Sequence, residues 1–147
     1  MKKNVLTLFL VAMFLTAIPG VIVAQPEIEW RRNYGGEDED NCRNIIQTTD
    51  GGFLLVGRNE SFGEVDWDAW ILKTDADGDS LWSREYGGDE EDCFTHVIEL
   101  EDDNYILAGY TNSEENNNQD LWLMRIDADR EIVWSHTYGG RYAEFPV

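Results

Sequence analysis

The chain has 147 residues, and its 30 acidic and 11 basic side chains give a formal net charge of -19. This charge argues against nucleic acid as a partner, because phosphates must be neutralised by Lys and Arg, and equally against an anionic membrane surface. The content of 42% hydrophobic and 12% aromatic residues excludes a disordered acidic tail. Two cysteines are too few for a disulfide scaffold. The length suits a single folded domain.

Residues 1–24 have the three parts of a secretory signal peptide. Lys2 and Lys3 form the positive region, an apolar run follows, and Ala24 is a small residue suited to cleavage. Cleavage predicts a mature chain that is secreted, displayed on the cell surface or periplasmic. A retained membrane anchor is the alternative, because residues 5–23 are nearly long enough to span a bilayer.

The rest of the chain is an internal repeat with a period of 52 residues. Aligning residues 30–81 with residues 82–133 needs no gap, and 17 of the 52 aligned positions are identical. Chance would give only a few matches, so the alignment predicts two copies of one structural unit. The recurring residues that we expect to form its structural core are Trp30, Trp82, Trp134, Tyr34, Tyr86, Tyr138, Trp70, Trp122, Asp68 and Asp120.

Each unit predicts four short strands separated by turn signals. The strands expected in the first unit are residues 44–48, 53–58, 68–74 and 80–86. Asp-Gly and Gly-Gly between apolar runs are hairpin signals, because Gly adopts positive φ at no steric cost. In the second unit Asn104 stands in the first turn, and Asn can also enter the left-handed region. Arg130 replaces Gly78 in the other turn, which predicts a somewhat strained hairpin.

Four strands per unit, with no helical periodicity after the signal peptide, predict an all-β fold of four-stranded antiparallel β-propeller blades. Residues 25–36 match the fourth strand of a unit and would close a ring. The remaining boundaries are blade 1 at residues 37–88, blade 2 at residues 89–140 and the start of a third blade at residues 141–147. Propellers typically need about 4–8 blades. We therefore expect a partial propeller, whose partners are the remaining blades of a longer chain or identical protomers.

The motif string of the first unit resembles a known repeat family. The string is Asp50-Gly51-Gly52-Phe53, Gly57, Asp68-x-Trp70-Ile71-x-Lys73-x-Asp75, Gly78, Trp82 and Tyr86-Gly87-Gly88. It resembles the repeats of bacterial and archaeal secreted or cell-surface β-propellers, which implies a propeller fold and an exported location. Asp75-x-x-Gly78-x-x-x-Trp82 is more loosely similar to quinoprotein-like propellers. Some of those bind pyrroloquinoline quinone and oxidise alcohols, whereas others are outer-membrane assembly adaptors without a cofactor.

Two sets of recurring residues have both a structural and a ligand-binding interpretation. The Trp and Tyr ladder suits packing between blades, and ligand stacking is its alternative. Asp68 and Asp120 stand just before the third strand, where a carboxylate can accept backbone N–H bonds from the preceding loop. Metal binding is the alternative for these two carboxylates.

The acidic runs Glu37–Asp40 and Asp89–Asp92 are the best functional candidates. Each follows a Tyr-Gly-Gly, and the link between blades should share one face with the loop between the second and third strands. Calcium requires several convergent oxygen ligands. A solvated acidic surface is the simpler interpretation, and a calcium site is the alternative. Its candidate ligands are Asp38, Asp40, Asp89 and Asp92.

No cluster in the sequence indicates catalysis. The turn at residues 75–79 lacks the glycine and glutamate of an EF-hand. Cys42 and Cys93 are not equivalent in the repeat, so free thiols are expected, with a disulfide as the alternative. Cys93-x-x-His96 is only half of a zinc pattern. We therefore expect a non-enzymatic binding scaffold without a cofactor, whose ligand is a glycan or a surface protein. The alternative is a catalytic propeller, quinoprotein-like or hydrolytic, with its active site in other blades.

Overall fold

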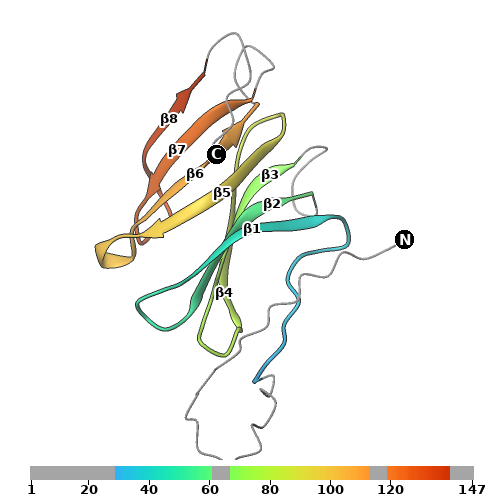
Figure 1. Cartoon of the computed structure of the whole chain (residues 1–147), viewed down its shortest axis with the longest axis vertical. Helices are drawn as coiled ribbons and strands as arrows, with labels where there is room; N and C mark the ends of the chain where they lie inside the picture. Colours follow the sequence, from blue (N-terminus) through green and yellow to red (C-terminus); the bar gives the residue numbers. More distant parts are fainter. Residues whose placement is uncertain (1–28, 61–66, 113–118, 140–147) are drawn as a thin grey trace, which may run out of the picture.

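The computed structural model describes residues 29–60, 67–112 and 119–139 (Figure 1). The predicted signal peptide and the predicted start of a third blade lie outside these residues. Within the described ranges, no helix is long and apolar enough to cross a membrane.

The described residues form two antiparallel four-stranded sheets, each with its strands in chain order (Figure 1). An apolar face of one sheet packs against an apolar face of the other. Sheet A contains β1 (Asp40–Gln47), β2 (Phe53–Asn59), β3 (Asp68–Thr74) and β4 (Ser80–Tyr86). Sheet B contains β5 (Asp92–Glu99), β6 (Tyr105–Thr111), β7 (Asp120–Ile126) and β8 (Ile132–Tyr138). The predicted all-β fold with four strands per repeat is confirmed.

The first strand of each unit is longer than its apolar residues predict. β1 begins at Asp40 rather than at residue 44, because Asp40 and Asn41 pair with the end of β2. The register then shifts between Cys42 and Asn44, which is a β-bulge, and the same shift occurs in β5 one repeat later. The polar start and the bulge both break the alternation of apolar residues that marks a strand in sequence.

The bulge explains why a glycine recurs in the second strand of each unit. A Cβ on Gly57 would collide with the carbonyl oxygen of Asn41, and a Cβ on Gly109 would collide with that of Cys93. Both glycines therefore allow the bulged first strand to approach the second strand closely.

The turns bear out one expectation about the left-handed region and correct another. Gly78 has φ of 77° and Arg130 has φ of 68°, so Arg130 takes the strained conformation predicted for it. In the other turn Asp103, not Asn104, occupies the left-handed region, with φ of 54°. Asn104 is extended at φ of -91°, because it follows the short 3-10 helix η1 (Glu101–Asp103) as its C-cap. The prediction for Asn104 was therefore wrong by one residue.

The larger core lies in the seam between the two sheets. Leu54, Val56 and Ile71 of sheet A are fully buried there, against residues that include Phe94 and Leu107 of sheet B. Strands β2 and β3 are buried on both faces, because a second cluster lies on the opposite side of sheet A.

Residues 29–36 cover that opposite side of sheet A (Figure 1, blue). Trp30 and Tyr34 pack against a cluster that includes Phe53, Leu55 and Trp70. The segment is not assigned to a strand, although its sequence matches the fourth strand of a unit. Its side chains nevertheless pack on one face of sheet A. The equivalent face of sheet B is the one that packs against sheet A in the seam.

Candidate functional site

One contact joins sheet A to sheet B through the residues that recur in the fourth strand. The Tyr86 hydroxyl donates a hydrogen bond of 2.8 Å to the carbonyl oxygen of Arg130, in the β7–β8 turn. Arg84 pairs with Glu131 at 3.0 Å. The Arg130 guanidinium lies 5.6 Å from the centre of the Trp82 ring. The Trp, Arg and Tyr of the fourth strand thus contact three parts of the turn: its left-handed residue, the acidic residue after it and a backbone carbonyl oxygen. We name this arrangement the joint, and we call a joint filled where both the strand and the turn are present.

The N-terminal segment makes the same joint one repeat earlier. The Tyr34 hydroxyl donates a bond of 2.7 Å to the carbonyl oxygen of Gly78, and Arg32 pairs with Asp79 at 3.1 Å. The Trp30 ring lies against Gly78, so that a Cβ on this glycine would be 2.8 Å from the ring. Each partner lies 52 residues before its counterpart in the seam, so the joint is a repeated contact and not a chance contact.

The third copy of this strand motif has no acceptor turn in the described part of the chain. Trp134, His136 and Tyr138 on β8 stand at the positions of the Trp, Arg and Tyr of the joint. Tyr138 is 52% exposed, whereas Tyr86 in the filled joint is 7% exposed. The ring of His136 stacks on that of Trp134, with centres 5.4 Å apart. The sequence identified these positions but did not show what each of them contacts.

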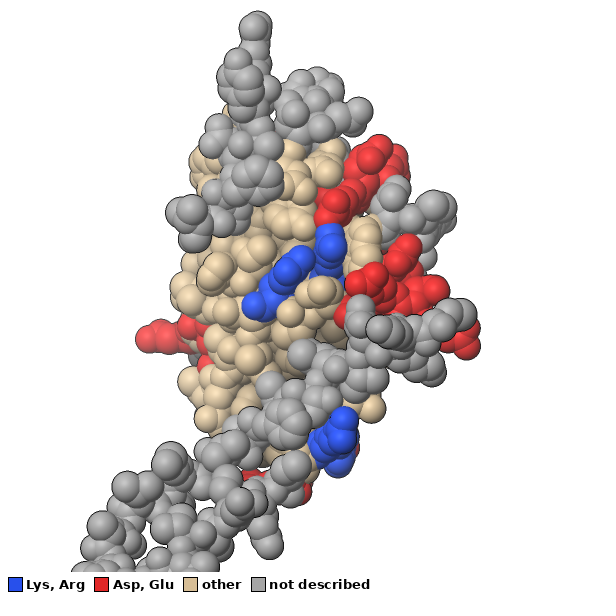
Figure 2. Space-filling view, turned by 45° about the vertical axis from the view of Figure 1, so that its right-hand side comes forward, with Lys and Arg blue, Asp and Glu red and all other residues tan. Residues whose placement is uncertain are grey.

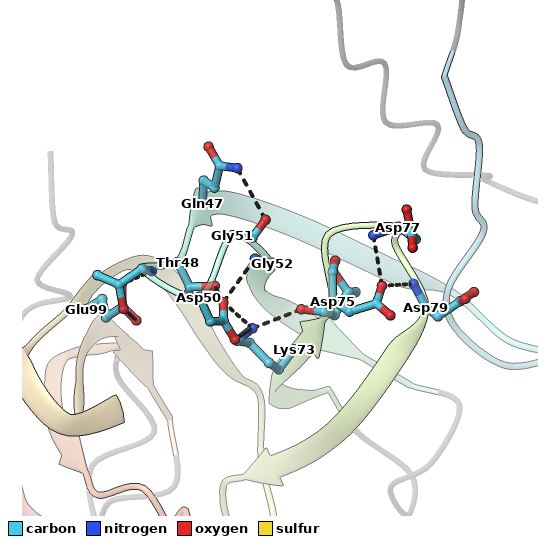
Figure 3. A network of polar contacts seen from close by, with 12 residues as sticks. Gln47, Thr48, Asp50, Gly51, Gly52, Lys73, Asp75, Asp77, Asp79 and Glu99 are labelled. Atoms are coloured by element: carbon cyan, nitrogen blue, oxygen red, sulfur yellow. Dashed lines mark hydrogen bonds and ion pairs between the residues drawn. The ribbon is translucent and has the colours of Figure 1, made fainter.

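In both filled joints a carboxylate closes the acceptor turn, and burial raises the pKa of the tyrosine that donates to it. Oδ1 of Asp75 accepts the backbone N–H groups of Asp77 and Asp79 at 3.0 and 2.8 Å, which closes the turn (Figure 3). Asp127 does the same one repeat later. Burial raises the pKa of Tyr86 to about 12, so its hydroxyl remains a donor at physiological pH.

A second polar network holds the other turn of sheet A (Figure 3). The buried ammonium of Lys73 lies 2.7 Å from the Asp50 carboxylate. The hydrogen bond from Lys73, with a further one from Thr48, lowers the pKa of Asp50 to about 2. Glu99 of sheet B accepts bonds of 2.8 and 3.1 Å from the backbone and hydroxyl of Thr49, so this turn also contacts the neighbouring sheet.

The remaining core residues lie at the third strands. Trp70 and Trp122 are buried, and Trp122 stacks on Phe94 at 4.9 Å and donates to the Ser135 hydroxyl at 2.7 Å. Asp120 is also buried, and a Cβ on Gly139 would collide with its carboxylate.

Asp68 has the equivalent place in sheet A. Its Oδ1 lies 2.7 Å from the position that a Cβ on Gly87 would take. Gly87 and Gly139, each the glycine directly after a recurring tyrosine, therefore leave room for the aspartate that opens the third strand.

The acidic links place two of the four candidate calcium ligands in backbone hydrogen bonds. Asp40 accepts the N–H of Gly36 and Asp92 accepts the N–H of Gly88, both at 2.8 Å, so each carboxylate closes its own link. Asp38 and Asp89 are exposed. Among the residues that the structure describes, no group of three or more His, Cys, Asp or Glu side chains is placed to hold a metal ion. Acidic side chains gather on one side of the surface, next to a few basic ones (Figure 2).

A polar cluster beside the seam was not found from the sequence. Arg58 forms an ion pair with Glu91, and the Tyr110 hydroxyl donates to the same Glu91 oxygen at 3.0 Å. The Arg58 guanidinium also lies 4.1 Å from the centre of the Trp67 ring. Arg58 and Tyr110 hold equivalent positions in the repeat but differ in type, so no recurrence marked them.

The two cysteines are free thiols, as expected, and burial raises the pKa of each. Cys93 is fully buried and Cys42 is half-buried. Burial therefore favours the neutral thiol over the reactive thiolate at both positions.

No family model and no curated protein sequence matches the chain.

Proposed function

We propose that this chain is a non-enzymatic, exported scaffold of the β-propeller type, and that it acts by binding a further blade-like unit on the side of sheet B that neither sheet A nor residues 29–36 cover. We name this side the outer face. One observation carries the proposal: the equivalent face of sheet A is the one that packs against sheet B. The apolar residues of the outer face are Ile98, Ile106, Ala108, Leu121, Leu123, Trp134 and Tyr138, and the basic residues His96, Arg125 and His136 lie among them.

The contrast between the two sheets supports this assignment. In sheet A the counterparts of the outer face belong to the seam core, and Leu54 and Ile71 there are 0% exposed. On the outer face Ile98 is 55% exposed, and the burial of β6 and β7 alternates between buried and half-buried residues. Exposed and half-buried apolar residues gathered on one face of a sheet suit an interaction site.

The kind of partner follows from what covers the counterpart face. Sheet B covers this face of sheet A with its own apolar face, and the β7–β8 turn completes the joint. The outer face belongs to a sheet with the same strand order, and it has a Trp and a Tyr at the same repeat positions. A sheet of the same repeat therefore fits it best. The remaining blades of a propeller are such sheets, whether they belong to the same chain or to another.

The proposal can be tested with two variants of the full exported chain. Trp30→Ala/Tyr34→Ala weakens the hold of residues 29–36 and opens an acceptor turn, while Leu123→Asp in the same chain blocks its outer face. We expect this acceptor chain to form a 1:1 complex with the wild-type chain, measured by light scattering, whereas each chain alone stays monomeric.

The controls separate binding from misfolding. Circular dichroism must show that the acceptor chain is folded. If it is not, the milder Arg32→Ala/Tyr34→Phe/Leu123→Asp chain takes its place. A wild-type chain with Leu123→Asp should no longer bind. The absence of a complex between folded chains would overturn the proposed function.

A further inference from the structure

We infer that the outer face selects units whose turn places an acidic residue directly after a left-handed residue, and that His136 is the residue that recognises the acid. This inference rests on the proposed function and adds the chemistry of the partner to it.

Both filled joints show the same acceptor chemistry. The left-handed residue is Gly78 in one turn and Arg130 in the other, and each offers its carbonyl oxygen to a tyrosine hydroxyl. The next residue is acidic in both, and its carboxylate pairs with an arginine of the fourth strand at 3.1 or 3.0 Å. A partner for β8 that repeats this turn would satisfy the Trp134 ring and the Tyr138 hydroxyl in the same way.

β8 differs from the two filled strands at one position of the joint. Where those strands have Arg32 and Arg84, β8 has His136, which is exposed. Arginine is charged at all physiological pH values, whereas histidine side chains gain their charge between about pH 5 and 8. The ion pair with the acid of the partner therefore forms only with protonated His136, and the joint should strengthen as the pH falls.

The other charged groups on this face do not replace His136. In β7 the residue opposite His136 is Leu123, and Arg125 lies opposite Trp134, one pair further along. On β5 the exposed His96 pairs with Ala108, across two intervening strands from β8. On β8 itself the neighbours on this face are Trp134 and Tyr138. The acid of the partner turn would thus face His136 as its nearest cation.

An intact second copy of this chain is not the partner that fits. Its turn at residues 75–79 is occupied by residues 29–36, and its turn at residues 127–131 is occupied by β4. The outer face therefore needs a four-stranded unit with an open turn, which the acceptor chain described above provides through Gly78 and Asp79.

The test measures the affinity of the wild-type chain for the acceptor chain at pH 8.0 and pH 5.5 by isothermal titration calorimetry. We expect binding to be about fivefold tighter at the lower pH, the size of one partly exposed ion pair. His136→Arg in the donor should bind tightly at both pH values. Asp79→Asn in the acceptor should remove the pH dependence, and His96→Gln in the donor should leave it unchanged.

The outcomes distinguish the two proposals. Absence of binding at either pH, even with His136→Arg, would refute the proposed function. Binding that is equal at both pH values, or that keeps its pH dependence with Asp79→Asn, would refute the role of His136 while leaving the scaffold function intact. Association of two intact wild-type chains would overturn the partner assignment.

Discussion

Tyr86 and Tyr138 are the same residue of the repeat in two different situations. The Tyr86 hydroxyl donates to the carbonyl oxygen of Arg130, and its ring is buried in the seam core. Tyr138 also follows a tryptophan four residues earlier on its strand, but it is half exposed. The two tyrosines therefore allow the energy of one joint to be measured against an internal control.

We predict that Tyr86→Phe lowers the free energy of unfolding by about 1–3 kcal/mol, because it leaves a partly buried carbonyl oxygen without its donor. Tyr138→Phe should change it by less than about 0.5 kcal/mol, as is usual at exposed positions. Urea denaturation followed by circular dichroism measures both values. Equal effects of the two substitutions would contradict the view that Tyr86 has an acceptor turn and that Tyr138 lacks one in the described part of the chain.

For single residues, the sequence predicted which positions belong to the structural core better than it predicted which residues contact each other. A spacing of 52 residues pointed to Trp82, Tyr86 and their counterparts, since recurrence is visible without a structure. The pairing of Arg84 with Glu131 was not visible, because the two residues are far apart in the chain. Glu91 recurs as Glu39 and was counted with the acidic run, but its pairing with Arg58 was not visible from the sequence either.

Among the elements, the third and fourth strands were predictable and the first strands were not. β3 and β4 have the bounds that their apolar runs and flanking turns predict. β1 and β5 begin with polar residues and contain a bulge, which depends on pairing with the next strand and leaves no local signal. The glycine opposite each bulge was recognised as part of the repeat, but its reason appeared only in the structure.

The bulge leads to a prediction about these glycines. Gly109→Ala should lower the free energy of unfolding by more than about 3 kcal/mol, because the new Cβ would collide with the carbonyl oxygen of Cys93 and force strands apart. Gly51→Ala is the control, since it has positive φ but no atom within 4 Å of its new Cβ. It should cost only about 1–2 kcal/mol. A thermal or urea midpoint for Gly109→Ala as high as that for Gly51→Ala would contradict this account of the bulge.

In the whole molecule, two nearly identical sheets have unequal surroundings. Sheet A is covered on both sides, by residues 29–36 and by sheet B, whereas sheet B is covered on one side in the described part of the chain. The repeat predicted that the units are alike, but no local pattern shows how many neighbours each unit has. The ring of a propeller thus remains a proposal, supported by the joint and by the outer face.

This inequality gives a test of the outer face that does not need a partner. Ile71 and Leu123 are equivalent in the repeat, but Ile71 is buried in the seam and Leu123 lies on the outer face. Ile71→Asp places a carboxylate in an apolar core and should cost more than about 4 kcal/mol, enough to prevent folding of a marginally stable domain. Leu123→Asp should cost about 1 kcal/mol or less, because its carboxylate can reach water.

The measurement is the free energy of unfolding of each variant, obtained by urea denaturation at a protein concentration at which the wild-type chain is monomeric. If Leu123→Asp also prevents folding, then the outer face is buried in the isolated chain, and it cannot serve as the docking surface. If Leu123→Asp folds and Ile71→Asp does not, one side of sheet B is open to solvent while its counterpart on sheet A is core. A chain with such a face retains an apolar surface that a further unit of the same repeat can bury, which is the physical basis of the proposed scaffold.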